Sequence, residues 1–351
     1  MSTAISDHFK EQAGWGDALG SPLTAQLLYR MRDDYLSGGV IADLISDWKT
    51  NPVRDALGLR LTGCLHYAVL TGRSPDLAAL YPKGETDWSI NEIWPVATAY
   101  LKDDADFVRE FIKSPPQTNE TRRGFMFLYG LLELSKATQK PIHILELGAS
   151  AGLNQNFDAF RYITNAWRWG DPMSPVEVTT DWQSLTPPLA TPLDIRGREA
   201  CDQHPLDLSD ADTRARLKSY IWPDQRDRLD RFDAAVDLTL ARGTIVEKAD
   251  AADWLERKLS EPRENTLTVV MHSVFYQYPP AETRQRISDL IEAAGARATQ
   301  NAPLAWLRYE PETLWGATKS SRMGLDYRLW PGDTRVRLAR SDGHVRLVLP
   351  A

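Results

Sequence analysis

The strongest chemical signal in the 351-residue sequence is a run of small residues, HILELGASAGLNQNFD, which begins at residue 143. Its acidic and small residues fall at every second position, where an apolar strand pattern gives way to a helix: Glu146, Gly148, Ser150 and Gly152. Small residues let a ligand approach the backbone closely, and exposed amides at a helix start favour anionic groups. The pattern therefore predicts a ligand-binding loop that ends at Asn154. The simpler alternative is a tight strand-to-helix turn without a ligand.

This run resembles the loops of two enzyme classes. As Glu-x-Gly-x-Ser-x-Gly it resembles the first motif of the Rossmann-like S-adenosylmethionine-dependent methyltransferases, with Ser150 in place of the usual middle glycine. As Gly-x-Ser-x-Gly it matches the nucleophile elbow of α/β-hydrolases, with Ser150 as nucleophile and His272 or His344 as base. The motif alone leaves both interpretations open.

The surrounding sequence favours the methyltransferase interpretation. Hydrolases place several strands and an HGGG-type loop before the elbow, whereas the residues before 140 show helical spacing. ACDQHPLDL resembles the end of the second methyltransferase strand, which implies that Asp202 binds the ribose hydroxyls. EKADAADWL resembles the end of the third strand, which implies that Asp250, with the adjoining Ala251, binds the adenine. A hairpin signal at Asp342-Gly343 matches the reversed last strand of that fold.

The spacing within this motif set requires an insertion. Asp202 lies 50 positions after Gly152 (202 minus 152), whereas the acidic residue of a dinucleotide fingerprint follows about 20 residues on. We therefore expect an aromatic insertion at about residues 160–193, as a small hairpin or a lid over the pocket. The alternative ribose ligands are Asp158, Asp171 and Asp181.

A second group of polar residues ends the apolar run TVVMHSVFYQYP, at the carboxyl end of a predicted strand, where open α/β sheets place their ligand sites. Methyl transfer depends mainly on proximity, and imidazole titrates near neutrality, so His272 can serve as a base if the acceptor must lose a proton. The alternative is a structural histidine. The predicted roles are catalysis for His272, Tyr276 and Tyr278, substrate binding for Gln277 and cofactor binding for Ser273.

A third group lies in QTNETRRGFMFLYG, just before the first strand. Thr118 or Asn119 can cap a helix there, with Glu120 in its first turn. If this helix start faces the pocket, Arg123 pairs with the carboxylate of the methionine moiety of the cofactor. Gln117 and Asn119 then line the acceptor side.

These residues need a scaffold to bring them together. From Pro22 to about Gln139 apolar residues recur at three- and four-residue spacing, which predicts an all-helical N-terminal domain over residues 1–139. From residue 140 strands alternate with helices, so we expect a Rossmann-like α/β domain over residues 140–351. Its sheet is predicted to be parallel with an antiparallel C-terminal hairpin.

A set of short motifs is spread over nearly the full length of the chain: Gly20-Ser21-Pro22, Arg60 to His66, Tyr81-Pro82, Gln117 to Glu120, Gly148 to Asn154, Trp222-Pro223, His272-Ser273 and Gln277-Tyr278. In these motifs the chain resembles an uncharacterised bacterial family, domain of unknown function 2332. The resemblance implies a methyltransferase-like fold and no particular reaction.

Composition narrows the classes of partner. The net charge of −7, with Lys and Arg dispersed, argues against nucleic acid. The two cysteines lack CxxC spacing, and the histidines lack partners at i+4, so we expect no metal site. No signal peptide or membrane-spanning run is visible, which favours a cytoplasmic location.

The sequence therefore predicts a methyltransferase that uses S-adenosylmethionine and a small-molecule acceptor. Three alternatives stay open: a serine hydrolase or acyltransferase through Ser150, a non-catalytic nucleotide-binding protein, and a nicotinamide dehydrogenase.

Overall fold

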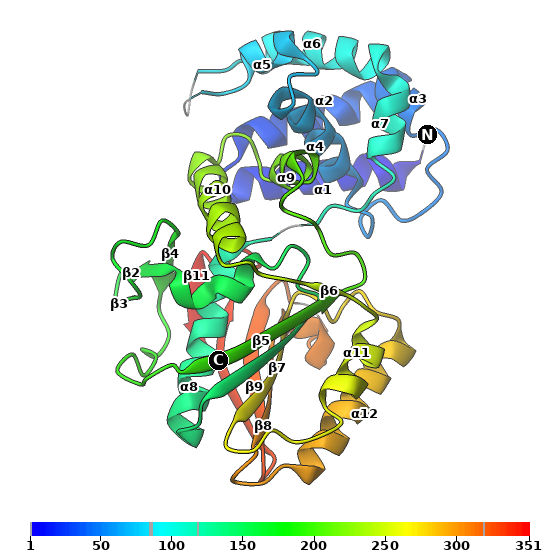
Figure 1. Ribbon diagram of the computed structural model, residues 1–351. Helices are drawn as coiled ribbons and strands as arrows, with labels where there is room; N and C mark the ends of the chain where they lie inside the picture. The colour runs from blue at the N-terminus through cyan, green and yellow to red at the C-terminus, as the bar shows by residue number, and fades with distance from the viewer. Residues whose placement is uncertain (1, 84–86, 118, 319) are drawn as a thin grey trace. The chain divides into compact units, whose positions relative to one another are not determined.

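The computed structural model describes residues 2–83, 87–117, 119–318 and 320–351, and its chain forms two compact units (Figure 1). The first unit comprises Met1–Thr118 and Leu208–Phe232, and the second comprises Asn119–Asp207 and Asp233–Ala351. The units therefore do not divide at residue 139. The helix that precedes the first strand belongs to the second unit, and the chain later returns to the first.

The first unit is built from helices. They are α1 (Thr3–Ala18), α2 (Pro22–Ser37), α3 (Val40–Leu44), α4 (Leu57–Leu70), α5 (Pro75–Leu80), α6 (Ile90–Asp103), α7 (Ala105–Phe111) and α9 (Ala211–Ser219). A further helix, α10 (Arg226–Ala241), begins in this unit and continues into the second.

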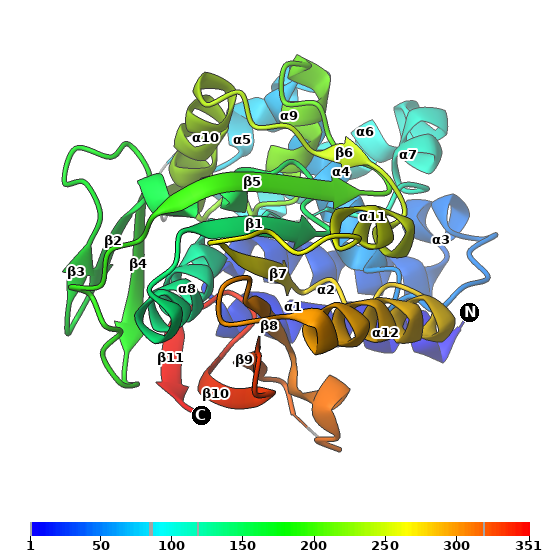
Figure 2. The same cartoon turned by 60° about the horizontal axis from the view of Figure 1, so that its bottom comes forward.

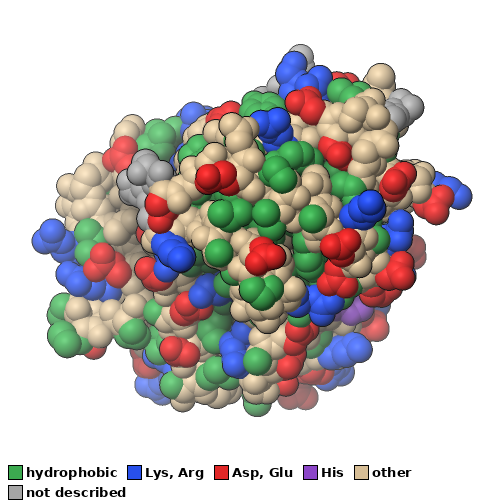
Figure 3. Space-filling view, turned by 90° about the horizontal axis from the view of Figure 1, so that it is seen from above, with side chains coloured by type: hydrophobic (Ala, Val, Ile, Leu, Met, Phe, Trp, Pro, Cys, Tyr) green, Lys and Arg blue, Asp and Glu red, His purple; other side chains and the backbone are tan. Residues whose placement is uncertain are grey.

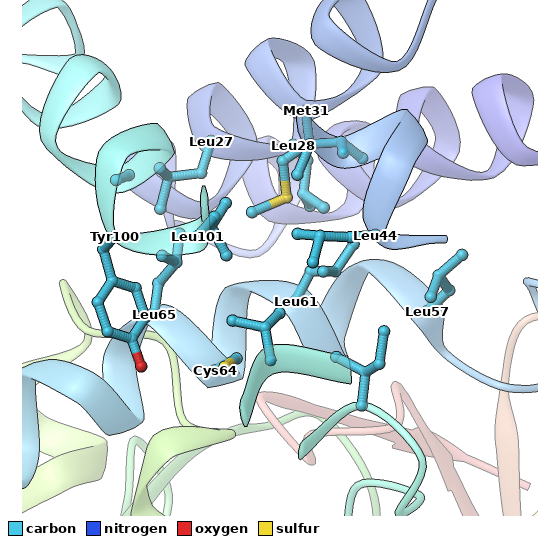
Figure 4. Packing of buried hydrophobic residues seen from close by; sticks show 14 of the residues in the cluster. Leu27, Leu28, Met31, Leu44, Leu57, Leu61, Cys64, Leu65, Tyr100 and Leu101 are labelled. Carbon is cyan, nitrogen blue, oxygen red and sulfur yellow. The ribbon is translucent and has the colours of Figure 1, made fainter. Parts of the chain in front are cut away.

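The core of the first unit forms around α4. Leu57, Leu61, Cys64 and Leu65 follow helical spacing, and all four are fully buried. Figure 4 shows them facing leucines and a methionine of α2 and Leu101 of α6. Because such cores are close-packed, replacing one of these leucines with alanine costs about 2–5 kcal/mol.

The second unit contains an eleven-stranded sheet of order β3-β2-β4-β11-β10-β9-β8-β7-β1-β5-β6. The strands are β1 (Ile142–Leu147), β2 (Arg161–Thr164), β3 (Arg168–Trp169), β4 (Glu177–Trp182), β5 (Ile195–Asp202), β6 (Glu247–Lys248), β7 (Leu267–Ser273), β8 (Leu304–Pro311), β9 (Met323–Trp330), β10 (Thr334–Ser341) and β11 (Leu347–Pro350).

Five neighbouring strands, β6, β5, β1, β7 and β8, run parallel. Among these five strands, β5 and β6 follow β1 in chain order and lie on one side of it, and the chain then crosses to β7 on the other side of β1. The order thus reverses between β1 and β7. In open α/β sheets, ligands bind beyond the carboxyl ends of the strands at such a reversal.

Helices cover both faces of the sheet (Figure 2). On one face lies α8 (Gly124–Thr138), whose Gly130 packs against Leu307 of β8. On the other lie α11 (Ala251–Lys258) and α12 (Ala281–Arg297), packed against Leu145, Val270 and Trp306. Because side chains alternate along a strand, Glu146 points to the face opposite Leu145.

The mostly parallel mixed sheet agrees with the predicted α/β class, and the predicted C-terminal hairpin is present as the antiparallel pair β10 and β11. The Asp342-Gly343 turn joins β10 to β11, and β8, β9 and β10 form a longer antiparallel run. The segment expected as an insertion forms β2, β3 and β4, and β4 pairs with β11. Its rings pack against α8: Phe125 and Tyr162 are 4.8 Å apart between centroids. Within the insertion β2 and β3 pair as a small antiparallel hairpin, one of the two predicted forms. The segment therefore belongs to the core, and the other predicted form, a lid, is wrong.

Candidate functional site

The loop after β1 has the backbone that its sequence requires. Gly148, Ser150 and Gly152 have φ values of +67°, +55° and +75°. Glycine tolerates this left-handed region, but serine adopts it rarely. The amides of Gly148 and Ala149 both donate to the carbonyl of Cys201, at 2.9 and 3.1 Å. The loop is therefore fixed to the end of β5.

Three of the predicted site residues meet at this loop. The half-buried carboxylate of Asp202 accepts the backbone N–H of Ser150 at 2.8 Å on Oδ2 and that of His204 at 2.9 Å on Oδ1. Asn119 Nδ2 donates to Ser150 Oγ at 3.1 Å. Asn119, Ser150 and Asp202 thus form a connected polar edge beside the glycines.

The alternative ribose ligands lie elsewhere. Asp158 receives two hydrogen bonds from Arg198, at 2.8 and 3.0 Å, and a third from Arg242, which together lower its pKa although burial opposes them. Asp171 closes a turn by accepting the amide of Met173. Asp181 lies in β4 at the far side of the sheet. Asp202 is therefore the carboxylate placed at the loop.

Beneath the loop, Glu146 is buried and accepts Gln155 Nε2 at 2.5 Å on Oε2. Burial raises its pKa to about 7, while the bond from Gln155 and the charge of Arg123 oppose this shift. A carboxyl group that titrates near neutrality at the end of a central strand is typical of functional sites. Gln155 is not among the residues predicted from the sequence, although it follows Asn154 directly in the same run.

The segment before α8 also reaches this place. Asn154 Nδ2 donates to the carbonyl of Glu120 at 3.3 Å, and Arg123 Nη1 donates to the carbonyl of Ser273 at 3.5 Å. The predicted cap is different: Glu120, rather than Asn119, caps a short 3-10 helix, η1 (Thr121–Arg123), by accepting the amide of Arg122. Thr118 lies outside the described residues.

Side chains of this chain occupy the side of Gly148 and of Gly152 on which a Cβ would stand. A Cβ at Gly148 would lie 2.2 Å from the ring of Phe275, and one at Gly152 would lie 3.0 Å from Thr244 and Val246. The space beside both glycines is therefore filled by side chains of this chain. The expected helix after the loop is η2 (Leu153–Ala159), a seven-residue 3-10 helix, so the expected anion site at a helix N-terminus is absent from this described segment.

His272, predicted as a base, lies on the other face of the sheet. Its side chain is fully buried, Nδ1 contacts Glu310 Oε1 at 2.5 Å, and Nε2 accepts Trp306 Nε1 at 3.0 Å. Both ring nitrogens are thus engaged, and the proton lies on Nδ1. The histidine therefore occupies a structural position rather than facing the loop, because the alternation of β7 directs it toward α12 with Val270.

The neighbouring residues of this group differ in their surroundings. Tyr276 stacks on His272 and donates from its hydroxyl to the carbonyl of Arg284 at 2.6 Å. Gln277 and Tyr278 are exposed, Tyr278 at 68%. Ser273 has a contact with the segment before α8, because its carbonyl accepts a hydrogen bond from Arg123.

Asp250 has a structural contact that the motif did not reveal. Its carboxylate caps α11 by accepting the amides of Ala252 and Asp253, at 2.9 and 3.2 Å, and it contacts Gln203 at 3.3 Å. Ala251 is buried in the cluster beneath α11. The Asp250 carboxylate therefore serves as the N-cap of α11.

Several motif residues of the first unit hold its two chain segments together. Ser21 Oγ and the amide of Leu23 both donate to Asp224, at 2.5 and 2.9 Å. His66 Nδ1 contacts the carbonyls of Ser219 and Ile221, at 3.2 and 2.9 Å. These contacts give the motifs Gly20-Ser21-Pro22 and Arg60 to His66 a structural role. Gln117, predicted to bind substrate, also belongs to this unit.

Other features of the described residues bear on partners. Among them, no cluster of three or more His, Cys, Asp or Glu side chains is arranged to hold a metal ion. None of the described helices combines the length and apolarity that crossing a bilayer requires. Figure 3 shows Lys and Arg interspersed with Asp and Glu over the face that it draws.

Comparison with known proteins gives one match. The model of a family described as "Uncharacterized protein conserved in bacteria (DUF2332)" matches residues 6–349. No curated protein and no solved structure matches the chain.

Proposed function

We propose that this chain, which belongs to the bacterial family DUF2332 as its motifs predicted, is an S-adenosylmethionine-dependent methyltransferase that acts on a small-molecule acceptor. The observation that carries the proposal is the position of the loop Gly148–Gly152. It lies at the reversal between β1 and β7, with the carboxylate of Asp202 at its edge.

The strand order supports a nucleotide ligand. The run β6-β5-β1-β7-β8 corresponds to the order 3-2-1-4-5 of doubly wound nucleotide-binding folds, which bind at their reversal point. Beyond β8 the sheet continues with reversed strands, beginning with the antiparallel β9, and the predicted C-terminal hairpin lies in this part of the sheet. We therefore interpret the second unit as a Rossmann-like methyltransferase domain.

The side chains at the loop fit such a cofactor. Asp202 offers a half-buried carboxylate to ribose hydroxyls, since each of its oxygens accepts only one hydrogen bond described here. Arg123 Nε and Asn154 Oδ1 are buried without a hydrogen-bond partner among the described residues, so both can serve the polar end of a ligand. Bound S-adenosylmethionine supplies an electrophilic methyl group, and the protein contributes mainly binding and orientation.

The first experiment is a calorimetric titration of the full chain with S-adenosylmethionine and S-adenosylhomocysteine. We expect micromolar binding that weakens about tenfold or more in Asp202→Asn, because the ribose loses a charged acceptor. Asp181→Asn, a carboxylate on β4, is the matched control. Absence of binding to either nucleotide would overturn the proposal.

A second function is favoured by one observation. Ser150 has a positive φ in a Gly-x-Ser-x-Gly turn, as the strained nucleophile elbow of a hydrolase requires. The two histidines considered as its base have other contacts: His272 contacts Glu310, and His344 Nδ1 lies 3.8 Å from Glu120. Labelling by a fluorophosphonate probe that disappears in Ser150→Ala would support the hydrolase.

A further inference from the structure

The guanidinium of Arg123 lacks the partners that a largely buried cation needs. Its Nη1 has one long hydrogen bond, 3.5 Å to the carbonyl of Ser273. Its Nε is buried and has no acceptor within the described residues. A buried charge without hydrogen bonds is costly, so such a group generally serves a ligand or a structural counter-ion.

Asn154 presents a second unsatisfied group. Its side chain is only 7% exposed, and its Oδ1 is buried without a donor in the part of the chain described. The bond from Nδ2 to the carbonyl of Glu120 fixes the orientation, because the flipped amide would oppose two oxygens. Asn154 therefore offers an acceptor to an N–H or O–H group.

The two groups belong to one place. The carbonyl of Glu120 accepts both Asn154 Nδ2, at 3.3 Å, and the backbone N–H of Arg123, at 3.1 Å. The charge of Arg123 also acts on Glu146, a buried carboxyl that is engaged by Gln155 and whose pKa burial raises to about 7. Glu146 is thus a weak counter-ion near neutrality, and both unsatisfied groups adjoin the segment from Glu120 to Arg123.

We propose that Arg123 and Asn154 bind a small carboxylate that carries a hydrogen-bond donor on the adjacent carbon, as in an α-hydroxy or α-amino acid. Arg123 donates to the carboxylate, since guanidinium and carboxylate match in geometry, and Asn154 Oδ1 accepts from the donor. The source of this carboxylate rests on the proposed function. The carboxylate belongs either to the methionine end of the cofactor or to the methyl acceptor.

The test uses three small probes on the full chain: lactate, propionate and lactamide, followed by NMR titration. We expect lactate to bind in the millimolar range, propionate more weakly and lactamide not measurably. Arg123→Met should weaken lactate binding about tenfold or more, since a charge-assisted pair is lost. Asn154→Leu should remove the preference for lactate over propionate. Arg122→Met, at the next position, is the matched control and should leave lactate binding unchanged.

Addition of S-adenosylhomocysteine separates the two sources. Displacement of lactate assigns the carboxylate to the cofactor, whereas simultaneous binding assigns it to the acceptor. If lactate binds through Arg123 while neither nucleotide binds, the carboxylate site stands and the methyltransferase proposal fails. If the wild-type chain does not distinguish lactate from lactamide, or if Arg123→Met binds lactate as well as wild type does, the carboxylate site is overturned.

Discussion

The ring of Phe275 lies against the Cα of Gly148, so close that a Cβ at residue 148 would be 2.2 Å from Cδ2 of the ring. The contact joins the loop after β1 to the segment after β7. The segments that follow β1 and β7 therefore pack directly against each other. Residue 148 must be glycine for steric as well as conformational reasons.

Gly148→Ala should destabilise the second unit more than its positive φ alone explains. Gly243 provides the matched control, because its φ is +61° and a Cβ there meets nothing within 4 Å. We expect Gly243→Ala to lower the free energy of unfolding by about 1–2 kcal/mol, and Gly148→Ala by a further 1–3 kcal/mol, roughly the usual cost of overpacking. Urea denaturation measures both. Equal losses in the two variants, or no rescue of Gly148→Ala by Phe275→Ala, would contradict the contact.

Glu310 should be a determinant of stability although no motif contains it. Its Oε1 accepts the amides of Phe275 and Tyr276, at 3.0 and 3.1 Å, besides contacting His272. Glu310→Ala leaves these buried donors without an acceptor and should cost about 3–5 kcal/mol. Glu310→Gln keeps one acceptor oxygen and should cost less. Glu256→Ala, which breaks an exposed ion pair, should cost under about 1 kcal/mol. A small loss in Glu310→Ala would refute the structural role.

Glu146 should make the second unit less stable as pH rises. Its pKa in the folded chain is about 7, raised from an ordinary value of 4.5. The contribution of Glu146 to the free energy of unfolding is therefore complete below pH 4.5 and is lost as pH rises through 7. Glu146→Gln removes the effect and should gain up to about 3 kcal/mol relative to wild type between these limits. Urea denaturation at about pH 5 and about pH 8 measures the difference. A pH-independent difference would show that Glu146 titrates normally.

His66 should have the opposite effect in the first unit. Burial lowers its pKa from 6.5 to about 4. The contribution of His66 to the free energy of unfolding is therefore complete above pH 6.5 and is lost as pH falls toward 4. His66→Asn retains a donor toward Ser219 and should reduce this acid destabilisation, which amounts to up to about 3 kcal/mol. Hydrogen exchange of α9 at the two ends of the range reports it. The exposed His204→Asn should leave α9 unchanged; unaltered acid sensitivity in His66→Asn would exclude His66 as its source.

The sequence predicted what local pattern determines. Apolar runs and small residues predicted the strand before the loop and the parallel alternation. The contacts of Asn119 and Asp202 with Ser150 join residues that the sequence had assigned to separate parts of one pocket. The face on which a side chain lies was harder to predict. His272 looked available because it ends an apolar run, but alternation places it under α12, and Glu310, 38 residues away, has no local signal.

Pairings between segments far apart in the chain could not be predicted from the sequence either. The partner of β4 is β11, near the end of the chain, so a segment predicted as a small hairpin or a lid extends the sheet. The return of Leu208–Phe232 to the first unit depends on contacts such as that between Gly63 and Tyr220. No periodicity in either segment indicates which distant segment it will meet.

That return constrains how the protein is made. A ribosome that has released α1 to α7 has not yet delivered Tyr220, whose ring fills the space beside Gly63. Domains generally fold in the order of their synthesis, but here the nascent first unit must wait, with part of its apolar interior uncovered, until residue 232 emerges. Completion of one unit is therefore interleaved with synthesis of the other, and a chain truncated at residue 118 should expose apolar surface rather than form a finished domain.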